Sequence, residues 1–430
     1  MASHPAQERP FATAAQTPPA AAPPPPYVPG TRAGEEGALR TARRWRMELA
    51  IWWREIDRLL LVLVLALMGV GTLAVAAASP ASARRLSTAA THLDDLHFFA
   101  LQLRWQAVGL VALFGLALQK RETARRLGIL FGFAMLAALL LVPVVGSTVN
   151  GSRRWLGMGI LSLQPSEFLK PAFAILLAWV LSWKQRDPRL PVMTICCALM
   201  ALVAGLLMMQ PDFGATVLFA CVWFVEILLA GLTLRRIAMV GALGVGGVGA
   251  AYLFYANARN RIDSFLSGGT AYDQVDLAHH TLVGGGWTGT GLWLGTQKLR
   301  LPEAHTDYIF SVIGEEFGLL ACALLVALYM AIVARVLVRL ADREEDYFTL
   351  LAASGLVAQL GGQAFINILV NLQLFPSKGM TLPLVSYGGS STVALCAGVG
   401  FLLAITRRNP YLSRDPFARP GQGFAAGHHR

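Results

Sequence analysis

The sequence predicts an all-α polytopic membrane protein with about ten transmembrane helices and a large extracytoplasmic loop between helices 7 and 8. Hydrophobic residues make up 55% of the 430 residues and charged residues only 14%, whereas a soluble domain carries about 25% charged residues. The mean hydropathy is +0.54. Because a soluble globule of this size still leaves most of its residues in contact with water, the composition excludes that class.

The first 58 residues are predicted to form a cytoplasmic tail. Alanine and proline dominate Phe11–Pro29, a composition that cannot bury a core and is typical of disorder. Arginine and tryptophan residues alternate between Arg40 and Arg58, which suits a cytoplasmic membrane interface. Nucleic-acid binding is the alternative explanation of the net charge of +11. We expect no nucleic-acid partner, because most of the basic residues flank membrane spans instead of forming one basic face.

The first apolar run, Leu59–Ala78, is long enough to span a bilayer, which takes about 20 residues. The sequence Ala76–Pro80 at its end resembles a signal-peptidase site, but the preceding segment and the apolar core are too long for a cleavable signal. We therefore expect an uncleaved first helix. Nine further apolar runs predict the other helices, namely Phe99–Leu118, Leu127–Val145, Phe168–Trp183, Leu190–Met209, Phe213–Gly231, Ile237–Ala256, Ile309–Val333, Phe348–Leu372 and Ser390–Ile405.

The distribution of Lys and Arg predicts the orientation. With both tails inside, the cytoplasmic segments hold 20 of these residues near the spans and the outer segments hold nine. The positive-inside rule then places both termini in the cytoplasm, which agrees with an even number of helices. The predicted organisation is a tail over 1–58, a transmembrane domain over 59–408 and a second cytoplasmic tail over 409–430.

Three outer segments are the expected places for chemistry, namely Gly146–Pro165, Asn257–Asp307 and Gln373–Gly389. The first contains Arg153 and Arg154 beside Trp155. Guanidinium forks bind phosphate in a bidentate manner, but the same residues also suit an anchor at the level of the lipid headgroups. Both interpretations stay open on the sequence alone.

The helix that follows begins with a cluster of polar residues. Ser166 is predicted to be its N-cap. Glu167 and Lys170 are three residues apart and share a helix face. Ionisable groups at this depth should face a cavity or a partner, and a purely structural ion pair is the alternative. Further along, Asp212 lies in a tight turn and is predicted to cap the next helix.

Two charged residues, Arg104 and Glu226, lie inside apolar runs, where we expect helix contacts or snorkelling more than catalysis. The five cysteines also lie in apolar runs, without metal-type spacing, and are predicted to pack.

The long outer segment contains the glycine-rich sequence Gly284–Gly291. No strand precedes it, so a nucleotide loop is disfavoured and a flexible loop beside the membrane is the simpler interpretation. Asp307 lies where this segment enters a helix. Partial desolvation there suits a general base, while a cap formed by Asp307 or Thr306 is the structural alternative. Glu315 and Glu316 lie deeper, where partners must offset their burial.

The last outer motif, Pro376–Ser391, combines prolines, glycines, Lys378, Ser390 and Ser391. A re-entrant or irregular segment is expected here, because irregular backbone at membrane depth survives only when it is buried in protein or lines a cavity.

From about Leu59 to Arg408 the chain resembles the SEDS family (FtsW, RodA and SpoVE). Within the family, His305–Asp307, Gly314–Glu316 and Lys378–Pro383 are most similar to the division type, FtsW. The resemblance is carried by separate motifs in the expected order, namely Asn150–Leu156, Gln164–Lys170, Pro211–Gly214, His305–Gly318 and Pro376–Ser391.

This resemblance implies a peptidoglycan glycosyltransferase that polymerises lipid II at the outer face of the cytoplasmic membrane during septal wall synthesis, with undecaprenyl diphosphate as the leaving group. It implies a class B penicillin-binding transpeptidase (FtsI-type) and other divisome membrane proteins as partners, and Asp307 as the catalytic residue. Tyr308 stands where the family has Phe. A divalent cation such as Mg²⁺ is a candidate cofactor. Candidate residues for binding lipid II are Arg153, Arg154, Lys170, Glu167, Lys378, Ser390 and Ser391, with Lys298 a weaker one.

Two other classes of protein remain in competition. A lipid II flippase would need polar groups across the whole membrane depth, whereas the ionisable motifs here gather at the predicted outer face. A non-catalytic scaffold for a transpeptidase would not need Asp307. Polymer formation from purified lipid II separates these classes.

Overall fold

The computed structural model describes residues 46–87, 92–149, 152–157, 163–231, 234–266, 274–341, 346–376 and 379–408. The predicted tails lie outside the described residues except for 46–58. The chain divides into two compact units, 1–52 and 53–430, and the helices named below belong to the second.

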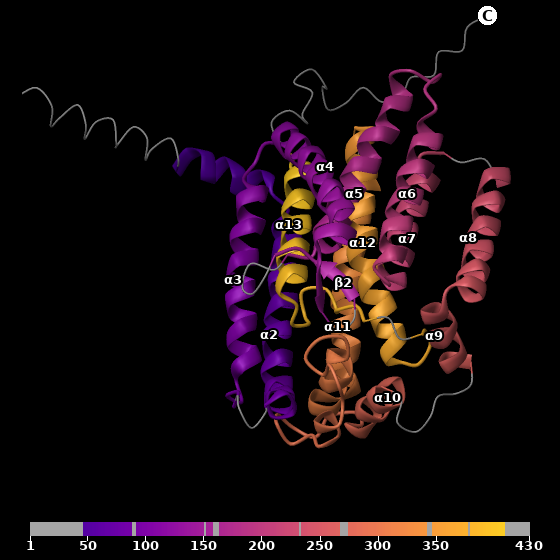
Figure 1. Ribbon diagram of the computed structural model, residues 1–430. Helices are drawn as coiled ribbons and strands as arrows, with labels where there is room; N and C mark the ends of the chain where they lie inside the picture. Colours follow the sequence, from indigo (N-terminus) through magenta and orange to yellow (C-terminus); the bar gives the residue numbers. More distant parts are fainter. Residues whose placement is uncertain are drawn as a thin grey trace, which may run out of the picture. The chain divides into compact units, whose positions relative to one another are not determined.

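Ten long helices form the framework of this unit (Figure 1). In the part of the chain that the structure describes, seven helices are long and apolar enough to cross a membrane, and three more are apolar but shorter. The prediction of an all-α polytopic membrane protein with about ten spans is confirmed. The ten are α2 (Arg58–Leu86), α3 (His97–Ala117), α4 (Arg121–Val145), α5 (Pro165–Ser182), α6 (Val192–Met209), α7 (Phe213–Leu229), α8 (Leu234–Phe254), α11 (Ile309–Ala341), α12 (Tyr347–Asn371) and α13 (Gly389–Ile405).

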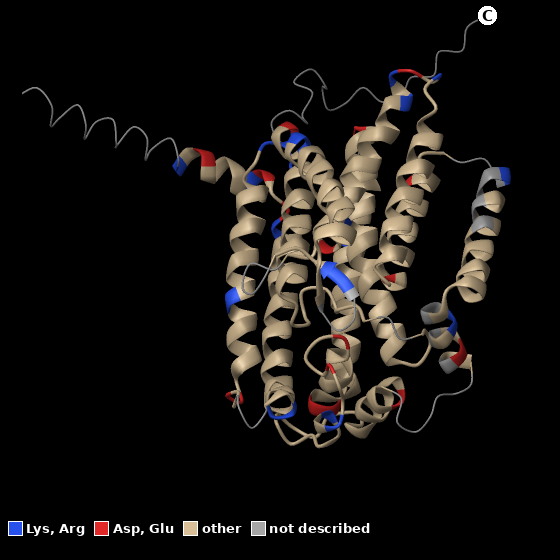
Figure 2. Cartoon of the chain, in the orientation of Figure 1, with Lys and Arg blue, Asp and Glu red and all other residues tan. Residues whose placement is uncertain are grey.

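The core of the bundle is built on α5, α12 and α13. Helix α13 packs along α3, while α5 packs against both α4 and α12. Most side chains of α5 and α13 are buried, as expected for helices that are apolar all round. Figure 2 shows charged residues mainly near the helix ends and at a short hairpin, with uncharged flanks between them. The flanks of α3 and α4 expose large apolar side chains such as Val111 and Leu130, which fits contact with lipid.

Helix α2 is longer than predicted. It begins after Asp57, whose carboxylate accepts a hydrogen bond from the Leu60 N–H at 3.1 Å, and it continues through Pro80 to Leu86. The sequence that resembles a cleavage site is therefore inside a helix, where Ala77 and Ala78 are fully buried. An uncleaved first helix stays a prediction, and the end of this helix was placed too early.

The start of α2 and the end of α13 lie at the same end of the bundle. Asp57 pairs with Arg335 at 2.9 Å and with Arg339 at 2.6 Å, both from α11. Glu55 pairs with Arg407, which follows α13. Burial alone would raise the pKa of Asp57, but hydrogen bonds from Arg335, the Leu60 N–H and Arg339 outweigh it and lower that pKa. These contacts agree with an even number of crossings.

Two outer segments contain secondary structure that the sequence did not show. The segment predicted as the large outer loop contains α9 (Ala256–Leu266), α10 (Gln274–Gly284) and the short 3₁₀ helix η3 (Gln297–Leu299). These helices are too short and too polar to stand out as spans. The first outer segment contains an antiparallel hairpin of β1 (Ser147–Val149) and β2 (Ser152–Trp155), which an all-α prediction does not include.

The segment before α13 is irregular, as one of the two expectations had it, and its described part is 379–388. Helix α2 packs closely on it at Gly71. A Cβ atom there would lie 2.6 Å from the Val385 Cα atom and 2.7 Å from the Leu384 carbonyl oxygen. Leu384 itself has a φ of 63°, a conformation that costs about 1–3 kcal/mol and persists only when its surroundings fix it.

Gly71→Ala is expected to lower the melting temperature of the detergent-solubilised protein. The added methyl group would collide with the backbone of Leu384 and Val385 and push α2 away from it. Overpacking of this kind costs about 1–3 kcal/mol. The matched control is Gly69→Ala in the same helix, since a Cβ atom at Gly69 meets no described heavy atom within 4 Å. Equal melting temperatures for the two variants would contradict this close approach.

Candidate active site

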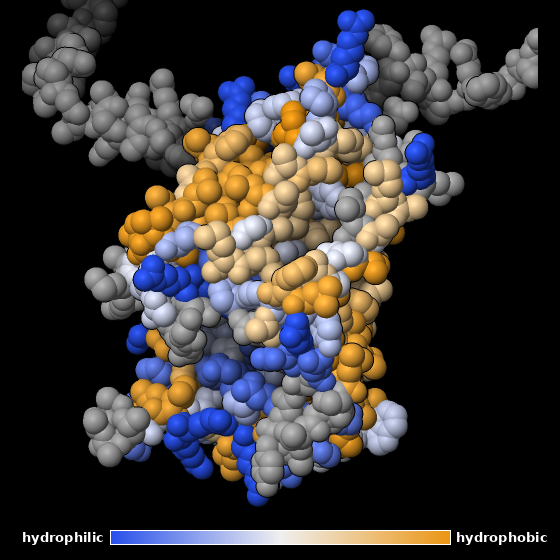
Figure 3. All heavy atoms as spheres, turned by 45° about the vertical axis from the view of Figure 1, so that its right-hand side comes forward, coloured by the Kyte–Doolittle hydropathy of each residue, from blue (hydrophilic) through white to orange (hydrophobic). Residues whose placement is uncertain are grey.

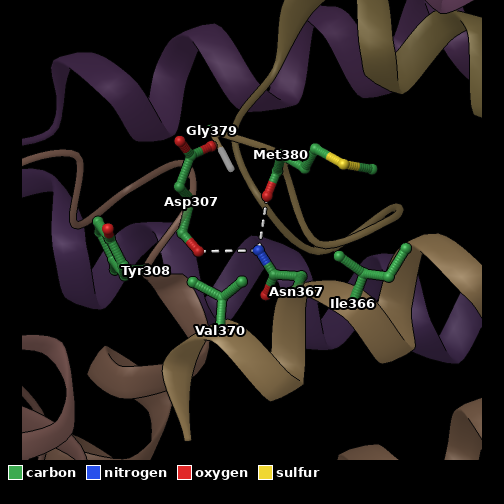
Figure 4. Close-up of a pocket in the computed structure, with 7 residues that line it drawn as sticks. All are labelled: Asp307, Tyr308, Ile366, Asn367, Val370, Gly379 and Met380. Atoms are coloured by element: carbon green, nitrogen blue, oxygen red, sulfur yellow. Dashed lines mark hydrogen bonds between the residues drawn. The ribbon is translucent and has the colours of Figure 1, made fainter. Parts of the chain in front are cut away.

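Asp307 lies two residues before α11 and is half-buried. It lines a small pocket to which three parts of the chain contribute (Figure 4): the turn before α11 with Tyr308, one face of α12, and the 379–388 segment with Gly379 and Met380. The carboxylate points toward Gly379, where a Cβ atom would come within 3.5 Å of Oδ2. Gly379 has a φ of 63°, so a larger residue would be strained beside the acid.

A ladder of amide side chains on α12 holds the backbone of this site. The Asn367 amide donates to the Asp307 carbonyl oxygen at 2.8 Å and to the Met380 carbonyl oxygen at 2.6 Å. Asn371 donates to the same Asp307 carbonyl at 3.2 Å. All members of the ladder are buried and recur every four residues, which places them on one helix face. They are Gln359, Gln363, Asn367 and Asn371.

Sequence reasoning missed this ladder, although its signal is visible. Amides at four-residue spacing inside an apolar span are costly in lipid unless they face partners within the bundle. The partners themselves are 60 residues away for Asp307 and 13 for Met380, which no spacing within the helix shows.

The ladder also reaches the polar start of α5. The Gln363 amide donates to the Thr381 carbonyl oxygen at 2.9 Å, and Lys170 approaches the other end of that amide at 3.5 Å. Lys170 is paired with Glu167 at 2.7 Å, while the Thr381 and Ser391 hydroxyl oxygens are 3.1 Å apart. Glu167, Lys170 and Ser391 therefore share one network with the 379–388 segment, and Glu167 already balances the charge of Lys170.

Arg154 holds the turn between α6 and α7. Its guanidinium donates to the carbonyl oxygens of Gln210 at 2.9 Å and Pro211 at 2.6 Å, and it lies 3.8 Å from the Asp212 carboxylate. Asp212 in turn accepts from the Ala215 N–H at 3.1 Å, which confirms the predicted cap of α7. These contacts use much of the Arg154 guanidinium, whose N–H groups were predicted as candidates for binding phosphate.

The other predicted residues are less tightly connected. Arg153 is exposed on β2 and donates to the Pro143 carbonyl oxygen at 3.2 Å. Ser390 is buried in the first turn of α13, and Lys378 lies outside the described residues. The prediction of Ser166 as an N-cap was wrong, because α5 starts at Pro165, whose fixed φ suits the first helical position.

The two charges inside apolar runs have different surroundings. Arg104 is exposed on α3, which agrees with snorkelling. Glu226 is fully buried on α7, and neither of its carboxylate oxygens has a hydrogen-bond partner among the described residues. It lies against Gly355 of α12, where a Cβ atom would meet Oε1 at 1.9 Å. Glu226 is thus a helix contact, as expected.

His305, two residues before Asp307, lies between two aromatic rings. Its ring centroid is 4.1 Å from that of Phe98 and 5.5 Å from that of Tyr387. The Tyr387 N–H donates to the His305 carbonyl oxygen at 2.9 Å. Burial lowers the pKa of His305 to about 4, although Glu303 acts in the opposite direction.

His305→Phe is expected to reduce the loss of stability on acidification. The pKa of histidine in an unfolded chain is about 6.5, so the unfolded state binds the proton first as the pH falls below that value. The contribution of neutral His305 to the free energy of unfolding is therefore complete above about pH 6.5. It decreases by up to about 3 kcal/mol as the pH falls toward 4. Melting temperatures of the wild type and of His305→Phe at pH 7.5 and 5.0 test this. An equal fall in melting temperature for the two proteins would contradict it.

Among the described residues, no group of three or more His, Cys, Asp or Glu side chains is placed to hold a metal ion. Asp307 is the carboxylate of the described pocket. A Mg²⁺ ion at this site would take most of its ligands from substrate phosphates and water, which this ion commonly does.

A family model described as "Cell cycle protein" and covering FtsW, RodA and SpoVE matches residues 57–411. The chain belongs to this family. The "Probable peptidoglycan glycosyltransferase FtsW" of Caulobacter vibrioides is 36% identical over 372 residues, covering 86% of this chain and 94% of the relative. The protein of the same name from Thioalkalivibrio sulfidiphilus is 37% identical over 395 residues, covering 87% and 92%.

Solved structures agree with this assignment. A chain from work described as "Structural coordination of polymerization and crosslinking by a peptidoglycan synthase complex" superposes with a TM-score of 0.68 at 28% identity, covering 82% of this chain and 97% of the other. The rod shape determining protein RodA of Thermus thermophilus gives 0.61 at 27% identity, covering 83% and 99%. The family resemblance seen in the motifs is confirmed.

Proposed function

We propose that the protein is a peptidoglycan glycosyltransferase that polymerises lipid II during septal wall synthesis. The observation that supports this most directly is the pocket around Asp307, in which a half-buried carboxylate meets the α12 amides and the 379–388 segment. Relatives that align over most of the chain bear the name of a peptidoglycan glycosyltransferase.

In this proposal Asp307 is the general base. It removes the proton from the GlcNAc 4-hydroxyl of one lipid II, the oxygen attacks C1 of the MurNAc of another, and undecaprenyl diphosphate leaves with inversion at C1. Cations must stabilise the departing diphosphate. Lys170, Lys378 and the exposed Arg153 are the candidates for this role. Arg154 is a weaker candidate, because backbone carbonyls already occupy its donors.

The site faces the outside of the cytoplasmic membrane in this proposal, with both termini in the cytoplasm. The excess of Lys and Arg on one side supports this orientation, as does the pairing of Glu55 with Arg407 at a single end of the bundle. A class B transpeptidase is the proposed partner, since a similar chain belongs to a complex that coordinates polymerisation and crosslinking. Mg²⁺ remains a candidate cofactor.

The deciding experiment uses the purified full chain in detergent with lipid II, with and without the transpeptidase. Glycan strands resolved by gel electrophoresis would support the proposal. A flippase would form no polymer, with or without the transpeptidase. A scaffold would form no polymer alone and would leave any polymer formed with the partner unchanged when Asp307 is replaced. Either of these two results overturns the proposal.

A further inference from the structure

Five large apolar side chains are exposed on the outer loop between α10 and α11. We call them the apolar ridge. Its members and their exposed fractions are Trp287 (72%), Leu292 (47%), Trp293 (54%), Leu294 (70%) and Leu299 (44%). Such a concentration of exposed apolar surface usually marks a place of contact with a protein or a membrane.

The loop that carries the ridge is held by its backbone. Thr290 donates its N–H to the Glu315 carbonyl oxygen at 2.8 Å, and Gly291 donates to that of Glu316 at 3.0 Å. The glycines permit this contact, since a Cβ atom at Gly285 or Gly289 would lie 2.0 or 2.2 Å from carbonyl oxygens of α11. These hydrogen bonds attach the glycine-rich loop to α11.

The two buried glutamates of α11 accept hydrogen bonds from three further N–H groups of the loop. The Glu315 carboxylate accepts from the N–H groups of Gln297 at 2.6 Å and Lys298 at 2.9 Å. Glu316 accepts from the Trp293 N–H and pairs with the Lys298 ammonium. These partners offset the burial of both acids, as expected. Because an unpaired backbone N–H is costly in lipid, these partners lower the cost of placing the loop at the bilayer interface.

Contacts with α2 give the depth of the ridge. The Trp293 indole donates to the Ala76 carbonyl oxygen at 3.1 Å, and Lys298 donates to that of Ala77 at 3.2 Å. Ala76 follows the first residue of α2, Arg58, by 18 positions, which is about 27 Å at 1.5 Å per residue. The hydrocarbon core of a bilayer is about 30 Å thick. The ridge is therefore level with the predicted outer interface, where tryptophan is enriched.

We propose that the apolar ridge inserts into the outer leaflet and contacts lipid. The loop continues through residue 300 into the turn that carries Asp307, so insertion would fix that turn relative to the bilayer surface. The insertion itself does not depend on the proposed function. What does rest on the proposed function is the effect of insertion on a lipid-linked substrate, because the diphosphate of such a substrate would lie at the same level as the ridge.

The test places an environment-sensitive fluorescent amino acid at residue 294 of the full chain reconstituted into lipid vesicles. Two further positions are controls, the exposed Glu303 of the same outer segment and Leu324, which is 72% exposed on α11. Vesicles with brominated acyl chains should quench the probe at 294 and 324 but not at 303, whereas aqueous iodide should quench it at 303.

Quenching of position 294 by iodide and not by brominated lipid would overturn the proposal. So would shielding of position 294 that appears only when the transpeptidase is added, because the ridge would then be a protein docking surface. The measurement needs no enzymatic activity. Failure of lipid insertion is thus distinguishable from failure of the proposed glycosyltransferase function, which the polymerisation assay tests.

Discussion

Asp307→Asn is expected to abolish glycan polymerisation from lipid II while the protein remains folded. Asparagine keeps the size of the side chain but cannot accept the hydroxyl proton, and loss of a general base typically lowers the rate by about 10²–10⁴-fold. The hydrogen bonds that Asn367 and Asn371 make go to the backbone carbonyl of residue 307, so the substitution keeps them. Asp307→Ala should give the same loss of activity.

The matched control for this prediction is Glu303→Gln, which removes an exposed carboxylate from the same turn. It should polymerise lipid II at close to the wild-type rate. Melting temperatures of both variants in detergent show whether the fold is intact. Full polymerisation by Asp307→Asn would remove Asp307 from the proposed mechanism and favour the scaffold.

Asn367→Leu is expected to have the second-largest effect. The change removes the amide donor from the Met380 carbonyl oxygen and one of two amide donors from that of Asp307, which keeps only Asn371. An unsatisfied buried acceptor costs about 1–3 kcal/mol, and each 1.4 kcal/mol in a barrier is about tenfold in rate. We expect kcat to fall on the order of 10- to 100-fold, with a smaller change in KM, because the loss is in the position of Asp307.

The control uses the other end of the same ladder. Gln359→Leu makes the same kind of change on the same face of α12, but Gln359 contacts Gln363 at 3.4 Å and neither carbonyl of the pocket. It should retain nearly wild-type kcat. If Asn367→Leu melts early yet keeps the wild-type kcat below its melting temperature, the ladder serves the fold and not the chemistry.

Much of the fold follows from the sequence because lipid restricts the options. A spanning segment in lipid must satisfy its own backbone, so each long apolar run becomes a helix. Contacts between residues close in the sequence were also predictable. Glu167 and Lys170 are three residues apart, and Asp212 lies directly before the helix that it caps. Helices α9 and α10 were missed, since short amphipathic helices lack the long apolar signal.

The site was predictable only in part. The motifs brought Asp307 and the 379–388 segment to attention, but the amides that join them belong to a different helix. The phosphate-binding role suggested for Arg154 depended on free donors, and only the folded structure shows those donors at the Gln210 and Pro211 carbonyls. Partners that are distant in the chain decide what a polar residue can do, and a single sequence does not contain that information.

The ion pairs at the base of the bundle also bear on how the chain is made. Asp57 finds its partners 278 and 282 positions later, at Arg335 and Arg339, and Glu55 must wait for Arg407. During synthesis α2 enters the bilayer long before any of these arginines leave the ribosome. Helix α2 can pack against α3 early, but its first turn gains these ion pairs only when translation is nearly complete. A chain truncated before residue 335 would lack all of them.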